Sequence, residues 1–162
     1  MAATDDQRGR GLGPTGETVR ARIREIRGRT PVTELSERLE KLGRPIPPLG
    51  VRRIESGERR VDVDDLIVLA AALGVSPVTL LAPNTPNASD SVSVTATPEP
   101  VGAEELWKWL RADRPLPGGG KLTGQELLTF VADASPAWRA RQYAEGVLEI
   151  LETSETNRPP AN

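Results

Sequence analysis

The most informative segment of the chain reads Val51-Arg52-Arg53-Ile54-Glu55-Ser56-Gly57-Glu58-Arg59-Arg60. Val51 and Ile54 are three positions apart, so in a helix their side chains share one face and can pack on a core. Arg52 and Arg53 then lie on the opposite face and present two guanidinium groups. Gly57 is the expected left-handed residue at which this helix ends. A short helix with one apolar and one cationic face suits the groove of a nucleic acid.

Two segments resemble the lambda-repressor-like, or Xre-type, helix-turn-helix family. The residues from Arg53 to Arg59 are similar to the R-I-E-x-G-x-R end of that family's recognition helix, and those from Asp65 to Ser76 are similar to its L-x-x-L-A-x-A-L-G-V-S helix. The two signatures occur in the family's order, and the resemblance covers about residues 17–83. It implies an all-α fold with a five-helix DNA-binding domain, and a sequence-specific transcriptional regulator that binds double-stranded DNA.

Apolar residues at helical spacing also predict helices in this part of the chain. The expected helices are, in chain order, 16–27, 31–42, 48–56, 62–73 and a short one through Leu80 and Leu81. Thr30 is the expected N-cap of the second helix and Asp62 that of the fourth. The fourth helix is apolar almost all round, which indicates a place at the centre of the bundle.

The turn between the second and third helices is unusually rich in proline. Pro45, Pro47 and Pro48 forbid a helix through positions 45 to 47, because each ring removes a hydrogen-bond donor and restricts the residue before it. Pro48 can still be the first residue of the third helix. The turn is therefore about three residues longer than is usual for the motif, and it resembles that of a bacterial variant of the family with a proline-rich turn.

The resemblance implies DNA-binding roles for individual residues. Pro48, Leu49 and Arg53 fall where family members reach base edges. Pro48 and Leu49 can offer only apolar contact to thymine methyl groups, so Arg53, aided by Arg52, is expected to be the main hydrogen-bonding reader, bidentate to a guanine. The alternative is that these two arginines are solvated surface charges. The candidate phosphate neighbours are Thr33, Arg44, Arg59 and Arg60.

Glu55 is expected to have a structural role, because phosphates would repel an acid that faces DNA. In the family this glutamate is paired with an arginine of the first helix. The resemblance assigns that partner to Arg27, with Arg24 as the second candidate. Gly57 is likewise expected to meet a backbone requirement and not to contact DNA.

The composition limits the classes of function. The chain has 162 residues, a net charge of −2, and neither cysteine nor histidine. Disulfides, Cys/His zinc sites, thiol nucleophiles and imidazole bases are thereby excluded, so we expect no enzyme activity, no cofactor and no metal. No apolar run reaches the roughly 18 residues of a membrane span, and the polar first residues form no secretory segment. We therefore expect a cytoplasmic protein.

Charge and composition change along the chain. Residues 17–60 hold twelve Arg or Lys against seven Asp or Glu, whereas residues 84–162 hold seven against eleven. The part of the chain that carries the motif is therefore also the basic part. A surface that binds a nucleic acid needs such a local excess of positive charge. The expected organisation is a disordered arm at 1–14, the DNA-binding domain at 15–83, a linker at 84–102, a C-terminal helical region at 103–153 and a disordered tail at 154–162.

The C-terminal region leaves several functions open. A capping box from Thr123 to Glu126 predicts a helix there, and the helices of this region could form a small bundle, dock on the first domain or make a dimer. A homodimer is expected, because family members usually bind paired half-sites. Two alternatives to a repressor of transcription remain: an antitoxin or phage-type immunity repressor whose C-terminal helices bind a partner protein, and an interaction scaffold that does not bind DNA.

Overall fold

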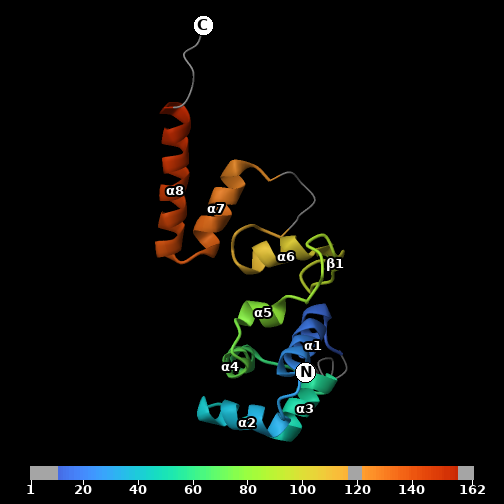
Figure 1. Ribbon diagram of the computed structural model, residues 1–162. Coiled ribbons are helices and arrows are strands. Elements are labelled where there is room, and N and C mark those ends of the chain that lie inside the picture. The colour runs from blue at the N-terminus through green and yellow to red at the C-terminus, as the bar shows by residue number, and fades with distance from the viewer. Residues whose placement is uncertain (1–10, 117–121, 157–162) are drawn as a thin grey trace, which may run out of the picture. The chain divides into compact units, whose positions relative to one another are not determined.

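The computed structural model describes residues 11–116 and 122–156, with side chains up to residue 146 (Figure 1). The chain divides into two compact units, Met1–Leu110 and Arg111–Asn162. Unit 1 contains α1 (Pro14–Arg27), α2 (Val32–Lys41), α3 (Pro48–Ser56), α4 (Val63–Leu73), α5 (Pro77–Leu81), β1 (Ser91–Val92), β2 (Val101–Gly102) and α6 (Ala103–Leu110). Unit 2 contains α7 (Gly124–Ala134) and α8 (Ala137–Thr156).

The predicted helical architecture is confirmed for the first part of the chain. The five expected helices are α1 to α5, and the regular secondary structure of the described residues is helical apart from the two short strands. The residues at 1–10 and 157–162, which we predicted to be disordered, lie outside the described residues. The functional roles that we assigned to the successive regions stay predictions.

One hydrophobic core holds α1 to α5 together. Its fully buried members are Ile23, Leu35, Leu39, Ile46, Val51, Ile54, Leu69 and Leu80. In α2 and α3, and in α1, where Val19 is also buried, a spacing of three or four positions places the buried residues on one face of each helix. α4 differs from the prediction, because Ile67 on its outer face is 52% exposed. α4 nevertheless contacts three of the other four helices of the bundle, α1, α2 and α5.

Local chemistry accounts for the helix ends. The predicted N-cap of α4 is confirmed, because the Asp62 carboxylate accepts a 2.7 Å hydrogen bond from the Asp65 amide. α3 ends at Gly57, whose φ of 86° is in the left-handed region that favours glycine. The predicted N-cap Thr30 is wrong, because Pro31 occupies that position and makes no side-chain hydrogen bond there. The proline ring fixes the φ of −57° at the start of α2 without help from a cap.

Residues 84–102 are ordered and are not the linker that we expected. β1 and β2 pair antiparallel. The buried side chains of this hairpin and of α6 are Val92, Val94, Val101 and Leu106. Thr15 and Thr95 exchange two hydrogen bonds, of 3.0 and 3.3 Å, which attach the hairpin to the start of α1. Valines at alternate positions are typical of a strand. We predicted a linker instead from the sequence, because the segment is also rich in Pro, Ser and Thr. The hairpin and α6 therefore extend unit 1 to Leu110.

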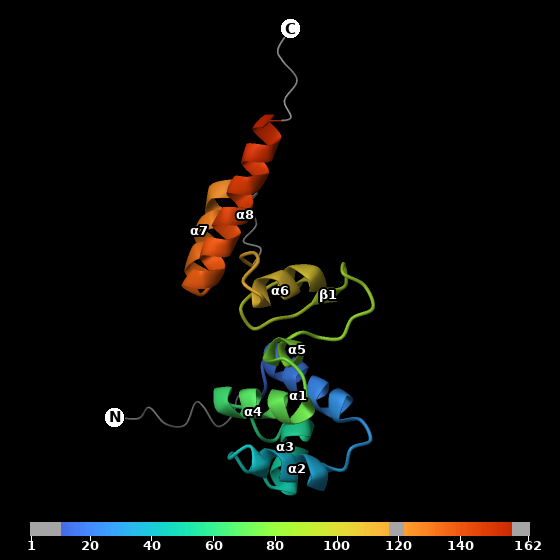
Figure 2. The same ribbon diagram turned by 60° about the vertical axis from the view of Figure 1, so that its left-hand side comes forward.

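Unit 2 is a pair of helices, α7 and α8, which lie side by side in both views (Figures 1 and 2). The predicted capping box of α7 is confirmed: the Thr123 amide donates to the Glu126 carboxylate at 2.8 Å, and the Glu126 amide donates to the Thr123 hydroxyl at 3.3 Å. Val131 is buried. α8 continues to Thr156, so the first residues of the predicted tail at 154–162 are helical.

The Asp62 cap should make the stability of unit 1 depend on pH. Hydrogen bonding from the Asp65 amide, with the charge of Arg44, holds the pKa of Asp62 below its ordinary value of 3.8. A pKa that is lowered in the folded state stabilises the fold above the ordinary value, and this contribution is lost as the pH falls through the folded-state pKa. Asn is also a good N-cap. We therefore expect the free energy of unfolding of Asp62→Asn to fall less than that of the wild type on acidification.

The measurement is urea unfolding followed by circular dichroism at a series of pH values from about 6 down to about 2.5, the range over which carboxylates titrate. Equal losses in the two proteins would show that Asp62 does not contribute to the acid sensitivity.

Candidate nucleic-acid interface

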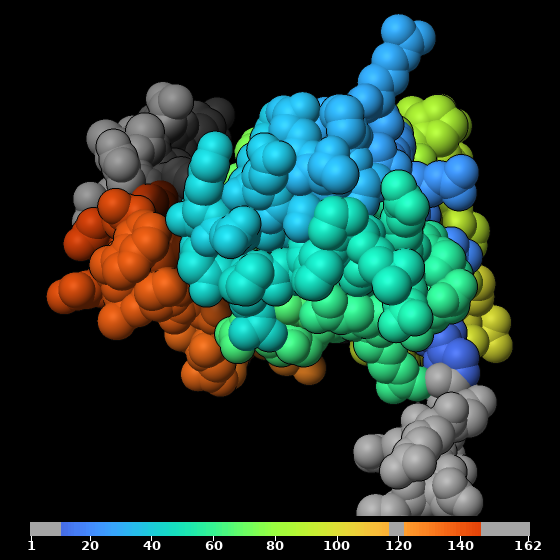
Figure 3. Space-filling view, turned by 90° about the horizontal axis from the view of Figure 1, so that it is seen from below, coloured from blue at the N-terminus to red at the C-terminus, as the bar shows by residue number. Residues whose placement is uncertain are grey.

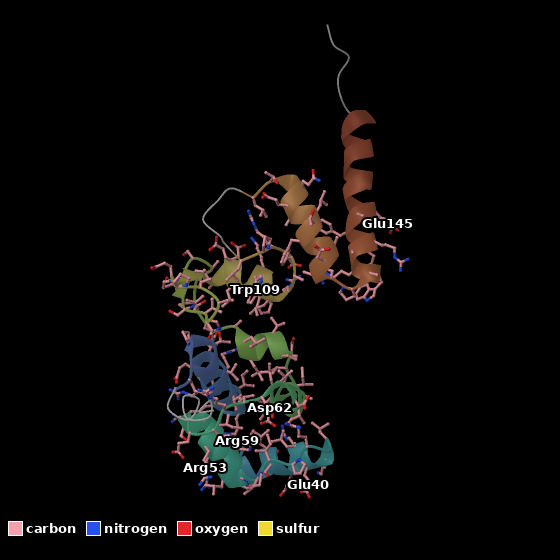
Figure 4. The ribbon with its side chains drawn as sticks, turned by 180° about the vertical axis from the view of Figure 1, so that it is seen from behind. Glu40, Arg53, Arg59, Asp62, Trp109 and Glu145 are labelled. Carbon is pink, nitrogen blue, oxygen red and sulfur yellow. The ribbon has the colours of Figure 1, made fainter. Side chains whose placement is uncertain are left out.

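α3 presents one face to the core and the other to solvent. Val51 and Ile54 are fully buried, whereas Arg52 and Arg53 are exposed. Figure 3 looks onto the surface that α2 and α3 form together, and Figure 4 shows Arg53 on the outer side of α3. The Arg53 Nε lies 4.0 Å from the Glu58 carboxylate, and both side chains are more than half exposed. An ion pair of this kind is weak, so the Arg53 guanidinium remains available to a ligand.

The proline-rich turn before α3 is held by one buried side chain and one hydrogen bond. Ile46, which lies between two prolines, is 1% exposed. The Ser36 hydroxyl on α2 donates a 2.7 Å hydrogen bond to the Ile46 carbonyl. Pro47 is the N-cap of α3, and Pro48 is its first residue. The lengthened turn is thus anchored to both the core and α2, and the start of α3 has a fixed position.

Glu55 lies on the inner side of α3 and pairs with Arg27, the partner expected from the resemblance. The two carboxylate oxygens accept hydrogen bonds of 2.6 and 3.0 Å from the Arg27 guanidinium, and both side chains are at most 15% exposed. Hydrogen bonding to Glu55 raises the pKa of Arg27 above its ordinary value. Arg20 of α1 donates to the Glu55 carbonyl at 3.3 Å. These contacts fix the C-terminal half of α3 on α1.

Asp65 of α4 joins the two chain segments on either side of α3. Its side chain is 2% exposed. The Oδ1 atom accepts a 2.8 Å hydrogen bond from Arg44 Nε, which precedes α3, and Oδ2 accepts a 2.8 Å hydrogen bond from Arg59 Nη2, which follows it. Arg44 also contacts Asp62 at 2.7 Å and Asp64 at 3.4 Å. The hydrogen bond to Asp65 is the main reason that the pKa of Arg44 is raised.

The prediction that Arg44 and Arg59 lie next to DNA phosphates did not consider the Asp65 cluster, and it stays a prediction. In the structure both guanidinium groups bind carboxylates. The sequence did contain a signal for this arrangement. Asp65 shares one face of α4 with the buried residues Val68, Leu69 and Ala72, and an acid on a buried face needs a charged or hydrogen-bonding partner.

The remaining predicted site residues lie at the surface of unit 1. Thr33 is exposed in the first turn of α2, and Leu49 of α3 is 58% exposed, whereas Pro48 is half-buried. Arg60 is exposed and its Nη2 lies 3.4 Å from the Gly11 carbonyl. Three exposed glutamates, which the prediction did not consider, lie farther along α2, namely Glu34, Glu37 and Glu40, the last of which is labelled in Figure 4. The cationic surface is therefore centred on α3.

Neither a metal centre nor a membrane span is found in the described part of the chain. No group of three or more Asp, Glu, His or Cys side chains there could hold a metal ion. No helix among those residues is long and apolar enough to cross a bilayer.

Residues 21–80 match the family model described as helix-turn-helix. The matched region extends from α1 into α5 and includes both α2 and α3 with the turn between them. No curated protein and no solved structure matches the chain.

Removing the charge of Asp65 should destabilise unit 1 strongly. Asp65→Asn removes the carboxylate that accepts charge-assisted hydrogen bonds from both Arg44 and Arg59. We therefore expect the free energy of unfolding to fall by about 2–4 kcal/mol. This loss is smaller than that for breaking a fully buried ion pair, because both arginines are partly exposed. The matched control is Asp64→Asn, since Asp64 also faces Arg44 but is 78% exposed. Its loss should be at most about 1 kcal/mol. Urea unfolding of both variants measures the difference, and similar losses would contradict the anchoring role of Asp65.

Proposed function

We propose that this protein is a sequence-specific repressor of transcription that binds double-stranded DNA, and that residues 21–80, which match the helix-turn-helix family model, form a lambda-repressor-like DNA-binding domain. The observation that supports the proposal most directly is that α3 has one apolar face and one cationic face. Val51 and Ile54 are buried in the core, and Arg52 and Arg53 are exposed to solvent. The major groove of B-DNA is about 12 Å wide and admits a helix. α3 enters this groove while α2 crosses the backbone.

Arg53 is the main reader of base sequence in this proposal. Its guanidinium can donate two parallel hydrogen bonds to O6 and N7 of a guanine, and Arg52 assists from the adjacent position. Leu49, at 58% exposed, contacts a thymine methyl group, and the half-buried Pro48 contributes to the same apolar edge. Because neither Leu49 nor Pro48 has a hydrogen-bonding side chain, only Arg52 and Arg53 can form hydrogen bonds to base edges from α3.

Two groups at the edge of this surface are proposed to bind phosphates. Thr33 offers its hydroxyl and the amides of the first turn of α2, where the helix dipole favours an anion. Arg60 contributes a second cationic contact. Arg44 and Arg59 act differently, because Asp65 holds them; they position α3. The exposed Glu37 and Glu40 disfavour close approach of phosphates to the second half of α2, so DNA lies along α3.

We further propose that the protein binds DNA as a homodimer through unit 2. Leu128, Trp138 and Tyr143 are 45%, 59% and 40% exposed, and large apolar side chains grouped in a two-helix unit favour association. A dimer also places two copies of α3 on half-sites about one helical turn apart, which raises the affinity of a module that makes few base contacts by itself.

The role of Arg53 is tested with an operator selected from random duplexes by the wild-type protein. Arg53→Ala should weaken binding to this operator by about 1–3 kcal/mol and reduce discrimination at one base pair, because a bidentate arginine–guanine contact is lost. The control is Arg38→Ala, which removes an α2 arginine paired with Glu34. Fluorescence anisotropy at several salt concentrations measures both. Binding that is indifferent to sequence and to Arg53→Ala would refute specific readout by α3.

The role of unit 2 is tested by sedimentation of the full chain. Trp138→Glu places a charge on the exposed apolar surface and should shift a dimer to a monomer, since an ionised group is not tolerated in an apolar contact. Gln125→Glu, a change at an exposed site of α7, should leave the association unchanged. A wild-type protein that is monomeric at all concentrations would contradict the dimer, and a stable complex with a co-purified neighbour would favour the antitoxin alternative.

A further inference from the structure

Gly50 is the third residue of α3. Glycine in a helix interior is less favourable than alanine, because it loses more conformational freedom on folding. Four other glycines in the described part of the chain have a positive φ, which only glycine adopts readily, but Gly50 is not one of them. Its backbone is helical, so any L residue could adopt the same angles. The reason for a glycine at this position therefore lies in the space around it.

The space beside Gly50 is filled by two side chains. A Cβ atom built on Gly50 would lie 3.0 Å from Arg59 Nη1 and 3.0 Å from Ile46 Cγ2, closer than the roughly 3.5–4.0 Å that is optimal for non-bonded carbon contacts. Both neighbours are held in place. Ile46 is 1% exposed, and the Arg59 guanidinium donates a 2.8 Å hydrogen bond to the buried Asp65. A side chain at position 50 would therefore displace α3 or break the contact between Arg59 and Asp65.

Arg59 follows α3 in the chain, and its side chain turns back along the helix. Its amide donates a 3.0 Å hydrogen bond to the Arg53 carbonyl in the last turn of α3, whereas its guanidinium lies beside Gly50 in the first turn. Figure 4 labels both Arg53 and Arg59. One residue thus contacts α3 near both of its ends and connects it to α4 through Asp65. Gly50 is the position at which this arginine crosses the helix.

We propose that Gly50 is a positioning residue for base readout, a role that rests on the proposed function. Its missing side chain lets the first turn of α3, which includes Leu49, lie close to Arg59 and to the proline-rich turn. The second half of α3, which includes Arg53, is held separately through Glu55, which binds α1. A side chain at position 50 moves the first turn and leaves the second half in place, so that Leu49 and Arg53 no longer reach base edges together.

The first test compares the operator selected from random duplexes by the wild-type protein with a scrambled duplex of the same composition. Gly50→Ala should lower the ratio of the two association constants at least about tenfold, because contacts to base edges lose their alignment. Binding to the scrambled duplex should not change, because it depends on phosphate contacts. A smaller folded fraction would lower both constants by the same factor and leave the ratio unchanged. Fluorescence anisotropy of the full chain measures both constants.

The second test is a double-mutant cycle that needs no DNA. Gly50→Ala should lower the urea midpoint of unit 1, although alanine is the better helix former. Arg59→Met removes the guanidinium, and in this background Gly50→Ala should lower the midpoint by less than half as much, because the contact with Ile46 is the only close one left. Equal shifts in the two backgrounds overturn the role of Arg59. If Gly50→Ala does not fold by itself, folding of the double variant demonstrates the same coupling.

Gly146→Ala is the matched control, because Gly146 also lies inside a helix, α8, and a Cβ atom there meets nothing within 4 Å. It should change neither the affinity ratio nor the urea midpoint of unit 1. A Gly50→Ala protein that keeps the wild-type ratio, or that has a raised midpoint, overturns the positioning role. A wild-type protein that does not distinguish the two duplexes contradicts the proposed function, and the cycle still decides whether Gly50 fits α3 against Arg59.

Discussion

Two arginines that flank α3 in the chain, Arg44 and Arg59, meet at the two oxygens of one buried carboxylate, that of Asp65. A helix of nine residues is too short to be stable by itself, and α3 has only two fully buried side chains of its own, Val51 and Ile54. Its orientation therefore depends on anchors outside it. The Asp65 cluster holds its flanking segments to α4, and the pair of Glu55 with Arg27 holds its inner face to α1.

The basic residues of unit 1 divide into two groups with different consequences. Arg27, Arg44 and Arg59 bind carboxylates inside or at the edge of the fold, where each charge is matched and contributes to packing geometry. Arg52 and Arg53 are exposed on α3. Positions 17 to 60 hold twelve basic and seven acidic residues, but several of these basic groups bind carboxylates and add little positive charge to the exposed surface. The orientation of α3 decides which arginines face outward.

The hairpin of β1 and β2 brings a distant part of the chain to the start of α1. Thr95 hydrogen-bonds with Thr15. Farther along α1, Arg20 donates a hydrogen bond to the main chain of Glu55, and Arg27 binds the Glu55 side chain. α1 therefore connects the added hairpin to the helix that is proposed to enter DNA.

The sequence by itself determined the helices of the first part of the chain, the left-handed end of α3 at Gly57 and the cap at Asp62, because spacing, glycine and capping act over a few residues. The resemblance to a known family added the pairing of Glu55 with Arg27. Only the tertiary structure decided that Arg44 and Arg59 bind Asp65, that residues 91–102 form a hairpin, and that α4 leaves Ile67 in solvent. Local patterns, such as the acid on a buried face of α4 and the alternating valines, indicate that a partner is needed. They do not specify the partner, because that depends on which surfaces meet between residues far apart in the chain.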